Sequence, residues 1–342
     1  INPHDLLRIL GVKAVQEQVS RLGHCSNLFM NEPQALLAKK LVEISGLDGK
    51  VFFCNSGAEA NEAAIKLARK WGAANGGRFE VVTMRNSFHG RTLATLTATG
   101  QAWCQDGYEP LPVGFNYADF NDIESVKAAV SEKTVAVMVE AVQGEGGVNA
   151  LDQIYLMEAD KLCHDNDIPF IIDEVQTGNG RTGKLYGYMN FKIHPDIVST
   201  AKGLGGGLPI GATLFFEKSH GTLKAGQHGS TFGANPISCA AACHVLDHID
   251  DALLSEVKAK SEYIFTTLTG KKGIKSVNGL GLMIGIETEG DSSAILKACM
   301  DRGILPIKAK TKIRLLPALN IPWDDLKAAV TILTEEAEKA VN

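Results

Sequence analysis

One lysine in the chain stands in a setting that could support covalent chemistry. Lys202 follows the apolar run Ile197–Thr200, and five glycines lie within the nine residues after it. Glycines let a flat ligand approach the backbone closely. A partly buried lysine loses its proton more readily, and an amine must be unprotonated to form a Schiff base. The stretch therefore predicts a reactive amine, with an ordinary surface lysine as the alternative.

An acid and an anion-binding turn add two further chemical groups. Asp173 ends an apolar run, so it would lie at the carboxyl edge of a sheet, where open α/β folds bind ligands. Ser56, Gly57 and Ala58 precede a helical pattern. Ser56 and Glu59 have the spacing of a capping box, and the amides of such a helix start can bind a phosphate. The alternatives are a turn-forming Asp173 and an ordinary capped helix.

Together these groups match the three parts of one cofactor. Pyridoxal phosphate needs a phosphate site, an acid beside its ring nitrogen and a lysine that forms a Schiff base. Here the amine, Lys202, follows the acid, Asp173, by 29 residues. With these motifs, the chain resembles the class III, fold-type I pyridoxal-phosphate aminotransferases, and among them the acetylornithine aminotransferases. The resemblance covers residues 27–321 and implies a large domain with a mostly parallel seven-stranded sheet between helices, followed by a small α/β domain.

The resemblance also implies how the cofactor, pyridoxal 5'-phosphate, is held. Lys202 would form the Schiff base and then carry a proton, Asp173 would bond the ring nitrogen, and Gln176 would bond the phenolic oxygen. Side chains would pack on both faces of the ring, and one phosphate ligand would come from the second subunit of a homodimer. The remaining cofactor-binding residues implied by the resemblance are Val175 and Phe88 for the ring faces, and Ser56, Gly57, Ala58 and the partner-donated Thr231 for the phosphate.

Four residues are implied to bind substrate. Arg91, with Ser230 nearby, matches the family residue for the carboxylate far from the reacting amine. Arg314 matches the residue for the α-carboxylate of glutamate, and Glu145 the acid that masks this arginine while a terminal amine is bound. Glu140 belongs to the same motif and is expected to be structural or close to the cofactor.

The resemblance predicts transfer of the δ-amino group of N-acetylornithine to 2-oxoglutarate, a ping-pong reaction of arginine biosynthesis. Other members of the class remain alternatives: ornithine, succinylornithine, 4-aminobutyrate and N-succinyldiaminopimelate aminotransferases. A catalytically silent protein that binds the cofactor is an alternative from a different class. The family also carries several tens of residues before the start of this chain, and Ala234 stands where it usually has glycine.

The apolar pattern predicts the elements that must position these groups. Six short β-branched runs alternate with helical patterns, which indicates a parallel sheet covered on both faces. From about residue 252 the pattern changes to helix, strand, helix, strand, helix. We therefore expect an N-terminal segment at 1–45, a large cofactor-binding domain at 46–250 and a small domain at 251–342. The expected strands are 51–54, 80–84, 135–140, 170–173, 197–200 and 212–216, then 281–287 and 312–316, and the expected helices are 6–18, 32–47, 59–74, 122–130, 154–165, 236–248, 253–268, 293–302 and 323–341.

Composition narrows the class of protein. The 342 residues carry a net charge of −5, which argues against a nucleic-acid or anionic-membrane surface. No apolar run approaches the ~18 residues of a membrane helix. Seven cysteines without a Cys-x-x-Cys pair indicate reduced thiols, with no metal site. We expect a protein of the cytoplasm, or of an organelle after removal of a transit peptide, that acts on small molecules.

Overall fold

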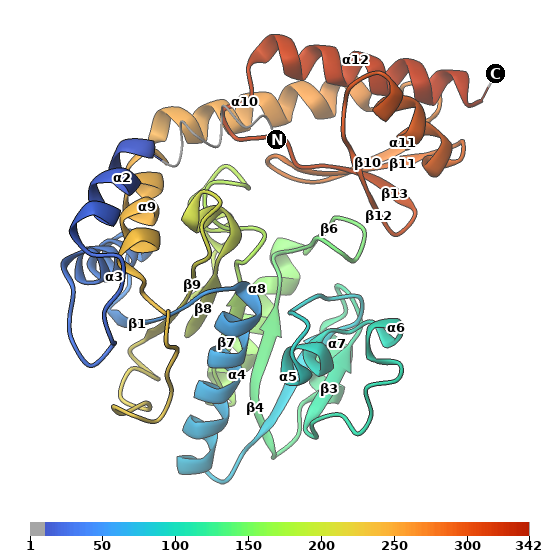
Figure 1. The fold of residues 1–342 in the computed structure, drawn as a ribbon. Helices are drawn as coiled ribbons and strands as arrows, with labels where there is room; N and C mark the ends of the chain where they lie inside the picture. The colour runs from blue at the N-terminus through green and yellow to red at the C-terminus, as the bar shows by residue number, and fades with distance from the viewer. Residues whose placement is uncertain (1–10, 342) are drawn as a thin grey trace.

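A seven-stranded sheet forms the centre of the larger part of the molecule. The computed structural model describes residues 11–341 (Figure 1). Within them the sheet has the order β1-β9-β8-β7-β4-β2-β3, and every strand is parallel to the others except β9. The predicted mostly parallel seven-stranded sheet is therefore confirmed. Its strands are β1 (Gly49–Cys54), β2 (Glu80–Met84), β3 (Phe115–Ala118), β4 (Thr134–Val139), β7 (Phe170–Asp173), β8 (Ile197–Thr200) and β9 (Gly211–Phe216).

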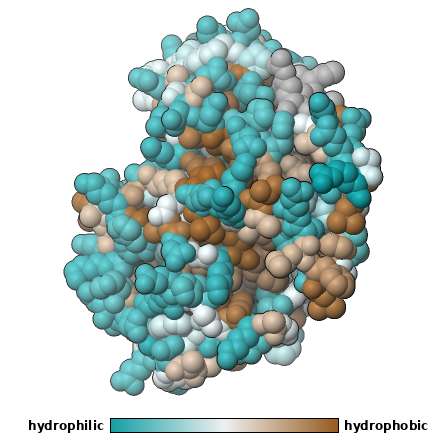
Figure 2. Space-filling model, turned by 90° about the vertical axis from the view of Figure 1, so that its left-hand side faces the viewer, coloured by the Kyte–Doolittle hydropathy of each residue, from teal (hydrophilic) through white to brown (hydrophobic). Residues whose placement is uncertain are grey.

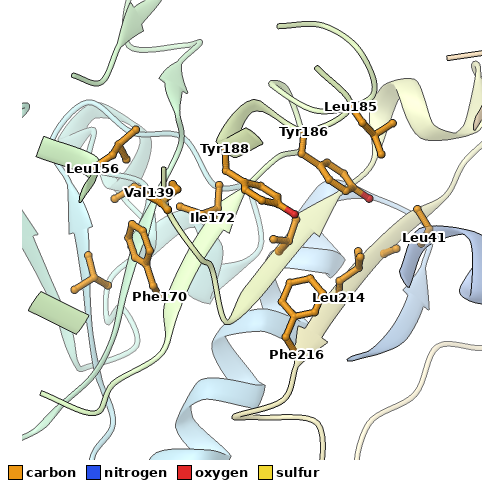
Figure 3. Packing of buried hydrophobic residues seen from close by; sticks show 14 of the residues in the cluster. Leu41, Val139, Leu156, Phe170, Ile172, Leu185, Tyr186, Tyr188, Leu214 and Phe216 are labelled. Atoms are coloured by element: carbon orange, nitrogen blue, oxygen red, sulfur yellow. The ribbon is translucent and has the colours of Figure 1, made fainter. Parts of the chain in front are cut away.

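Helices cover both faces of this sheet because its strands are apolar on both sides. In β4, Val137 and Val139 point into the core under α3, α8 and α9, whereas Met138 points into the core under α4. Figure 3 shows the first of these cores, with Phe170 and Ile172 of β7 beside Val139. The helices of this part are α3 (Glu32–Ser45), α4 (Gly57–Ala74), α5 (Leu93–Ala98), α6 (Ala102–Gln105), α7 (Ile123–Ala129), α8 (Gln153–Asp165) and α9 (Pro236–Asp247).

A second, four-stranded sheet occupies the C-terminal part, shown in orange and red in Figure 1. Its strands are antiparallel in the order β10-β11-β13-β12, and three helices pack on it around their own apolar core. The sequence pattern missed β10 and β12, because their residues are largely polar or half-exposed and show little alternation. The elements are α10 (Asp251–Leu268), β10 (Ile274–Leu280), β11 (Met283–Thr288), α11 (Ser292–Asp301), β12 (Ile307–Ala309), β13 (Lys312–Leu315) and α12 (Trp323–Lys339).

The N-terminal helices pack on α9, which lies beside them in Figure 1. The first described helix is α2 (Val12–Arg21), so the predicted helix at 6–18 begins outside the described residues. Two short strands, β5 (Val142–Gln143) and β6 (Asn149–Ala150), form a hairpin after β4. The proposed domain boundaries remain predictions. In the described part of the chain, no helix is long and apolar enough to cross a membrane.

The arrangement of the large sheet brings the predicted chemical groups to one edge. β1, β2, β4, β7 and β8 are parallel, so their carboxyl ends point the same way. Gly57 follows β1, Phe88 follows β2 and Glu140 follows β4. Asp173 ends β7 and pairs in register with Ser199 of β8, three residues before Lys202. Residues far apart in the sequence therefore meet at the carboxyl edge, where ligands bind in such sheets.

Candidate active site

A cavity of about 200 Å³ opens at this carboxyl edge. Its walls come from the segments that follow β1, β2, β4, β7 and β8, together with the first turns of α4. The cavity therefore collects most of the residues predicted to bind the cofactor. Its lining residues are Gly57, Ala58, Asn61, Phe88, His89, Gly90, Arg91, Glu140, Asp173, Val175, Gln176 and Lys202.

Lys202 faces this cavity from a strained backbone. Its φ is +46°, in the left-handed region that costs a non-glycine residue roughly 1–2 kcal/mol. The Asn179 side chain holds the preceding residues, since its Nδ2 donates to the Ala201 carbonyl oxygen and to Thr200 Oγ1, both at 3.0 Å. Such strain persists only where the surroundings enforce it, and it clusters at functional sites.

The surroundings of Lys202 also favour the neutral amine. Burial of the side chain lowers the pKa of Lys202, and the charge of Arg314 acts in the same direction. The charges of Asp173, Glu140 and Glu145 oppose this but do not cancel it. The side chain retains open surface toward the cavity, so the amine is both desolvated by the protein and reachable by a ligand. This combination suits a nucleophilic lysine.

Asp173 is a buried carboxylate with three hydrogen-bond donors. Its Oδ2 accepts from Asn61 Nδ2 at 2.7 Å and contacts His89 Nδ1 at 2.8 Å. Its Oδ1 accepts from the Val175 amide at 2.9 Å. Burial opposes a charged His89, but the hydrogen bond and charge of Asp173 and the charge of Glu140 raise the pKa of His89 above its usual value. The acid is thus held rigidly and its Oδ1 has room for a second donor.

The start of α4 provides the predicted anion site. Ser56 caps the helix by accepting from the Glu59 amide at 3.2 Å, and the Glu59 carboxylate accepts from the Asn55 amide at 2.9 Å. Gly57 must be glycine, because a Cβ there would lie 2.5 Å from a methyl carbon of Val175. Gly57 and Ala58 both line the cavity at the positive end of an 18-residue helix. This end of the cavity suits a phosphate.

Two apolar side chains border the space between the anion site and Lys202. Phe88 and Val175 both line the cavity, so a flat ring can lie against them. The Phe88 amide donates to Glu140 Oε2 at 2.9 Å. Burial raises the pKa of Glu140 to about 7, although the charges of His89 and Lys202 and this hydrogen bond oppose the rise. Glu140 is therefore a buried acid that lines the cavity.

Arg314 reaches the site from the smaller sheet. Its Nη1 lies 2.7 Å from Glu145 Oε1 and donates to Gln176 Oε1 at 3.3 Å. Gln176 Nε2 also donates to Glu145, at 3.3 Å. Burial would raise the pKa of Glu145, but the hydrogen bond and charge of Arg314 lower it. The acid and the arginine predicted to interact form an ion pair, and Gln176 links that pair to the cavity.

Arg91 and the loop of Ser230 are more open to solvent. The Arg91 guanidinium lies 5.3 Å from the ring centres of both Phe88 and Trp103, and Arg91 also lines the cavity. Thr231 is exposed and is not among the cavity-lining residues of this chain. The loop is anchored by Asn27, which donates to the carbonyl oxygens of Ser230 and Gly233 at 2.8 and 2.9 Å.

The alanine that replaces the family glycine near this loop does adopt the glycine conformation. Ala234 has a φ of +59° and is almost completely buried. A left-handed angle is costly for alanine, which has a Cβ. Ala234 therefore bears backbone strain next to the loop that Asn27 anchors.

Several site residues were not singled out from the sequence. Asn61 joins the site because it lies one turn after Gly57 on the buried face of α4, and a polar residue at such a position was an available signal. His89, which outside the family context would be taken for a structural histidine, contacts Asp173. Asn179 and Trp103 had no sequence signal, since their partners lie in other segments.

The residues present fit pyridoxal phosphate. The cavity has an anion-binding helix start, two apolar walls, a held carboxylate with a free acceptor position, and a desolvated lysine. These groups come from the segments at the ends of four strands, β1, β2, β7 and β8.

Comparison with known proteins gives a consistent result. The family model described as aminotransferase class-III matches residues 10–336. The acetylornithine aminotransferase of Haemophilus ducreyi is 48% identical over 329 residues, covering 95% of this chain and 84% of the relative. That of Methanocaldococcus jannaschii is 46% identical over 332 residues, covering 95% and 83%. A solved ornithine aminotransferase of Toxoplasma gondii, with PLP at partial occupancy in its active site, has a TM-score of 0.91 at 30% identity and covers 97% of this chain and 82% of that chain.

The buried acid gives a first prediction. Glu140 binds its proton more tightly in the folded protein, with a pKa of about 7 against an ordinary 4.5. Its contribution to stability is therefore fully present below pH 4.5 and is lost as the pH rises through about 7. In Glu140→Gln the amide oxygen can still accept from Phe88. We expect this variant, without cofactor, to lose less unfolding free energy than wild type between about pH 5 and about pH 8, by on the order of 1–3 kcal/mol.

Denaturant unfolding at a series of pH values measures this difference. Glu132→Gln, which changes an exposed glutamate, serves as the control and should follow wild type. Parallel pH profiles for wild type and Glu140→Gln would contradict the prediction.

Proposed function

The chain belongs to the class-III aminotransferases, and from this membership and the site we propose that it transfers the δ-amino group of N-acetylornithine to 2-oxoglutarate. It is a pyridoxal-phosphate-dependent transaminase. The observation that carries the proposal is that Gln176 joins the cavity of Lys202 to the ion pair of Glu145 and Arg314. The names of the relatives support the choice of substrate. We place the reaction in arginine biosynthesis and in the cytoplasm, or in an organelle after loss of a transit peptide.

We propose that the cavity residues hold the cofactor in the roles expected from the family. The amides of Gly57 and Ala58, with Ser56, would bind its phosphate, and Asp173 would accept from its ring nitrogen. Phe88 and Val175 would cover the ring faces, and Gln176 would donate to the phenolic oxygen. When bound, the cofactor supplies an electron sink for the charge left by proton removal from the carbon next to the reacting nitrogen.

Lys202 has two tasks in this proposal. Its Nζ attaches the cofactor, and after release it takes a proton from the δ-carbon of the donor and returns it during the exchange. Burial favours the unprotonated amine that both tasks require. Asp173 holds the proton on the ring nitrogen, supported by Asn61 and His89. Lys202 and Asp173 need not move far for these tasks, because both already line the cavity.

The two half-reactions use the arginines differently. The donor places its carboxylate near Arg91 and Ser230, while Glu145 keeps Arg314 occupied. In the second half-reaction the α-carboxylate of 2-oxoglutarate or glutamate displaces Glu145 and pairs with Arg314. A guanidinium binds a carboxylate through two parallel hydrogen bonds, so this exchange replaces one carboxylate by another at the same donor.

We further propose a homodimer in which Thr231 contributes to the neighbouring site. Thr231 is exposed and lies outside the cavity of its own chain. Beside its loop, Leu28, Phe29 and Met30 are 89%, 67% and 96% exposed, and Phe232 is 58% exposed. Figure 2 views the side of the molecule that carries α2, α3 and α9, and shows apolar groups gathered along its middle. Exposed apolar clusters of this kind mark association surfaces.

Comparison of amino donors tests the proposed reaction. The free α-ammonium group of ornithine would lie near the Arg91 guanidinium, whereas acylation removes that like charge. We expect kcat/KM for N-acetylornithine to exceed the values for ornithine and 4-aminobutyrate by at least about tenfold, with 2-oxoglutarate as acceptor. A higher value for one of the other donors would assign the chain to that activity instead.

Replacement of Lys202 tests the chemistry. We expect Lys202→Ala to lower kcat by at least about 10²–10⁴-fold and to abolish the visible absorption of the covalently attached cofactor. Lys133→Ala is the matched control, because Lys133 is exposed just before β4, at the opposite edge of the sheet. Spectra and steady-state rates of the purified variants give the answer. Unchanged activity of Lys202→Ala would exclude the proposed role.

Substitution of Phe29 tests the dimer. We expect Phe29→Asp to halve the mass measured by light scattering, because it buries a charge in an apolar interface. Ile154→Asp, at a residue of α8 that is 73% exposed, should keep the wild-type mass. Thr231→Ala should keep the dimer but weaken cofactor binding. A wild-type monomer, or a dimer unaffected by Phe29→Asp, would contradict the proposed interface.

A further inference from the structure

We infer that Arg181 is a positioning residue that sets the place of Arg314, so that it governs binding of the amino acceptor but not of the donor. The inference rests on the proposed use of 2-oxoglutarate as acceptor. Arg181 belongs to the segment that follows β7, which also carries Val175 and Gln176. Arg314 belongs to β13 of the other sheet. The segment after β7 must therefore be tied to the smaller sheet if Gln176 is to stay beside Arg314.

The Arg181 side chain forms that tie. Its Nη1 donates to the carbonyl oxygen of Pro317, three residues after Arg314, at 2.5 Å. The same nitrogen donates to the carbonyl oxygen of Leu282, in the turn between β10 and β11, at 3.1 Å. β11 pairs with β13, and Gly285 lies opposite Arg314 in that pairing. Both contacts of Arg181 therefore act on segments that carry or flank the strand of Arg314.

The backbone of Arg181 adds a second, independent connection. The Leu282 amide donates to the Arg181 carbonyl oxygen at 2.9 Å. Gly281 approaches so closely that a Cβ there would lie 2.5 Å from that same oxygen, and its φ is +60°. The turn between β10 and β11 thus requires a glycine in order to dock on Arg181. The side chain and the main chain of Arg181 therefore both hydrogen-bond to the same turn.

The charge of Arg181 is not used in an ion pair. Among residues 11–341 it has no carboxylate within salt-bridge distance, and the hydrogen bonds of its side chain go to two backbone carbonyls. Burial lowers the pKa of Arg181 to about 10. A half-buried cation without an acid partner gains little for stability. The presence of Arg181 is therefore better explained by its effect on the position of Arg314 than by a gain in folding free energy.

Arg181 also borders a second cavity, of about 370 Å³, that adjoins the first. Gln176 and Lys202 line both cavities, and Leu316 and Ala318, which follow Arg314, line the second. The residues after Arg314 are thus not packed solidly against the cofactor segment along this side. Since packing does not fix the distance between the segment after β7 and the strand of Arg314 here, hydrogen bonds across the cavity are needed to fix it.

Binding of the acceptor and binding of the donor depend differently on the position of Arg314. Bidentate binding of the acceptor's α-carboxylate needs the Arg314 guanidinium in one place, and small displacements weaken it. The donor's carboxylate is assigned to Arg91, which lies in the segment before α5 and contacts Phe88 and Trp103. No Arg181 contact reaches that segment in the described residues. Loss of Arg181 should therefore affect one half-reaction.

Arg181→Met and Arg181→Lys test the inference. The methionine removes both hydrogen bonds of the side chain, and the lysine keeps a charged donor. For each variant, KM for 2-oxoglutarate and for N-acetylornithine is measured together with the dissociation constant of glutarate, a dicarboxylate that cannot react, and the melting temperature. Arg78→Met is the matched control, because Arg78 also donates only to backbone carbonyls, those of Asn75, Asn166 and Asp167.

We expect Arg181→Met to raise KM for 2-oxoglutarate and the dissociation constant of glutarate by about tenfold or more. KM for N-acetylornithine should change by less than about twofold. Arg181→Lys should recover part of the loss, and it carries the test if the methionine variant does not fold. Arg78→Met should leave all three constants unchanged even if it melts at a lower temperature.

A parallel rise in both KM values, or a lower melting temperature with unchanged constants, would overturn the inference. Failure of the proposed function would be seen separately, as a wild-type enzyme that does not accept 2-oxoglutarate. Glutarate binding would then still decide the inference: weaker binding in Arg181→Met would support it, and equal binding would overturn it.

Discussion

A buried carboxylate at the end of a buried strand is the constraint on which the site depends. Asp173 is surrounded by protein, so its oxygens must be hydrogen-bonded or the fold would lose several kcal/mol. Donors come from α4, from the segment after β2 and from its own loop. Each of these segments also supplies a wall of the cavity. The hydrogen bonds to Asp173 therefore bring the anion site, the aromatic wall and the loop of Val175 and Gln176 together around the same cavity.

Strain at Lys202 is the second consequence of this arrangement. The chain must turn sharply after β8 to place the amine over the cavity, and Lys202 adopts a left-handed conformation to do so. Asn179, itself at a φ of +56°, hydrogen-bonds to Thr200 and Ala201, the two residues before Lys202. The local cost is offset by the packing of the large sheet, whose strands are buried on both faces. A strained lysine can therefore be kept in a stable protein.

The smaller sheet matters because it places a cation beside the cavity, next to Gln176, from outside the large sheet. Arg314 is held by Glu145 and Gln176, and its strand is tied to the cofactor segment by Arg181. In the proposed reaction the acid is exchanged for a substrate carboxylate, whereas the contacts of Arg181 with the backbone remain. The proposed exchange would thus change one contact of Arg314 while its strand stays fixed, which would let one site accept two substrates of different shape in turn.

Much of the fold followed from local pattern. The apolar runs at 80–84, 170–173 and 197–200 have the same bounds in the structure as predicted, because each is short, β-branched and bounded by turn residues. β3, β10 and β12 escaped detection, since their side chains are only partly buried and their partners are remote in sequence. The helix start at Gly57 and the strand end at Asp173 were likewise readable from adjacent residues.

What the sequence determined by itself was the inventory: a lysine among glycines, an acid at a strand end, a capped helix start and the family motifs around them. What only the tertiary structure decided was the partnership of residues with no sequence relation, such as Asn61 with Asp173, Asn179 with the backbone before Lys202, and Arg181 with Pro317. The physical reason is that strand order and docking of the two sheets set these distances. Propensity and spacing act over a few residues, whereas these contacts join segments up to 136 residues apart.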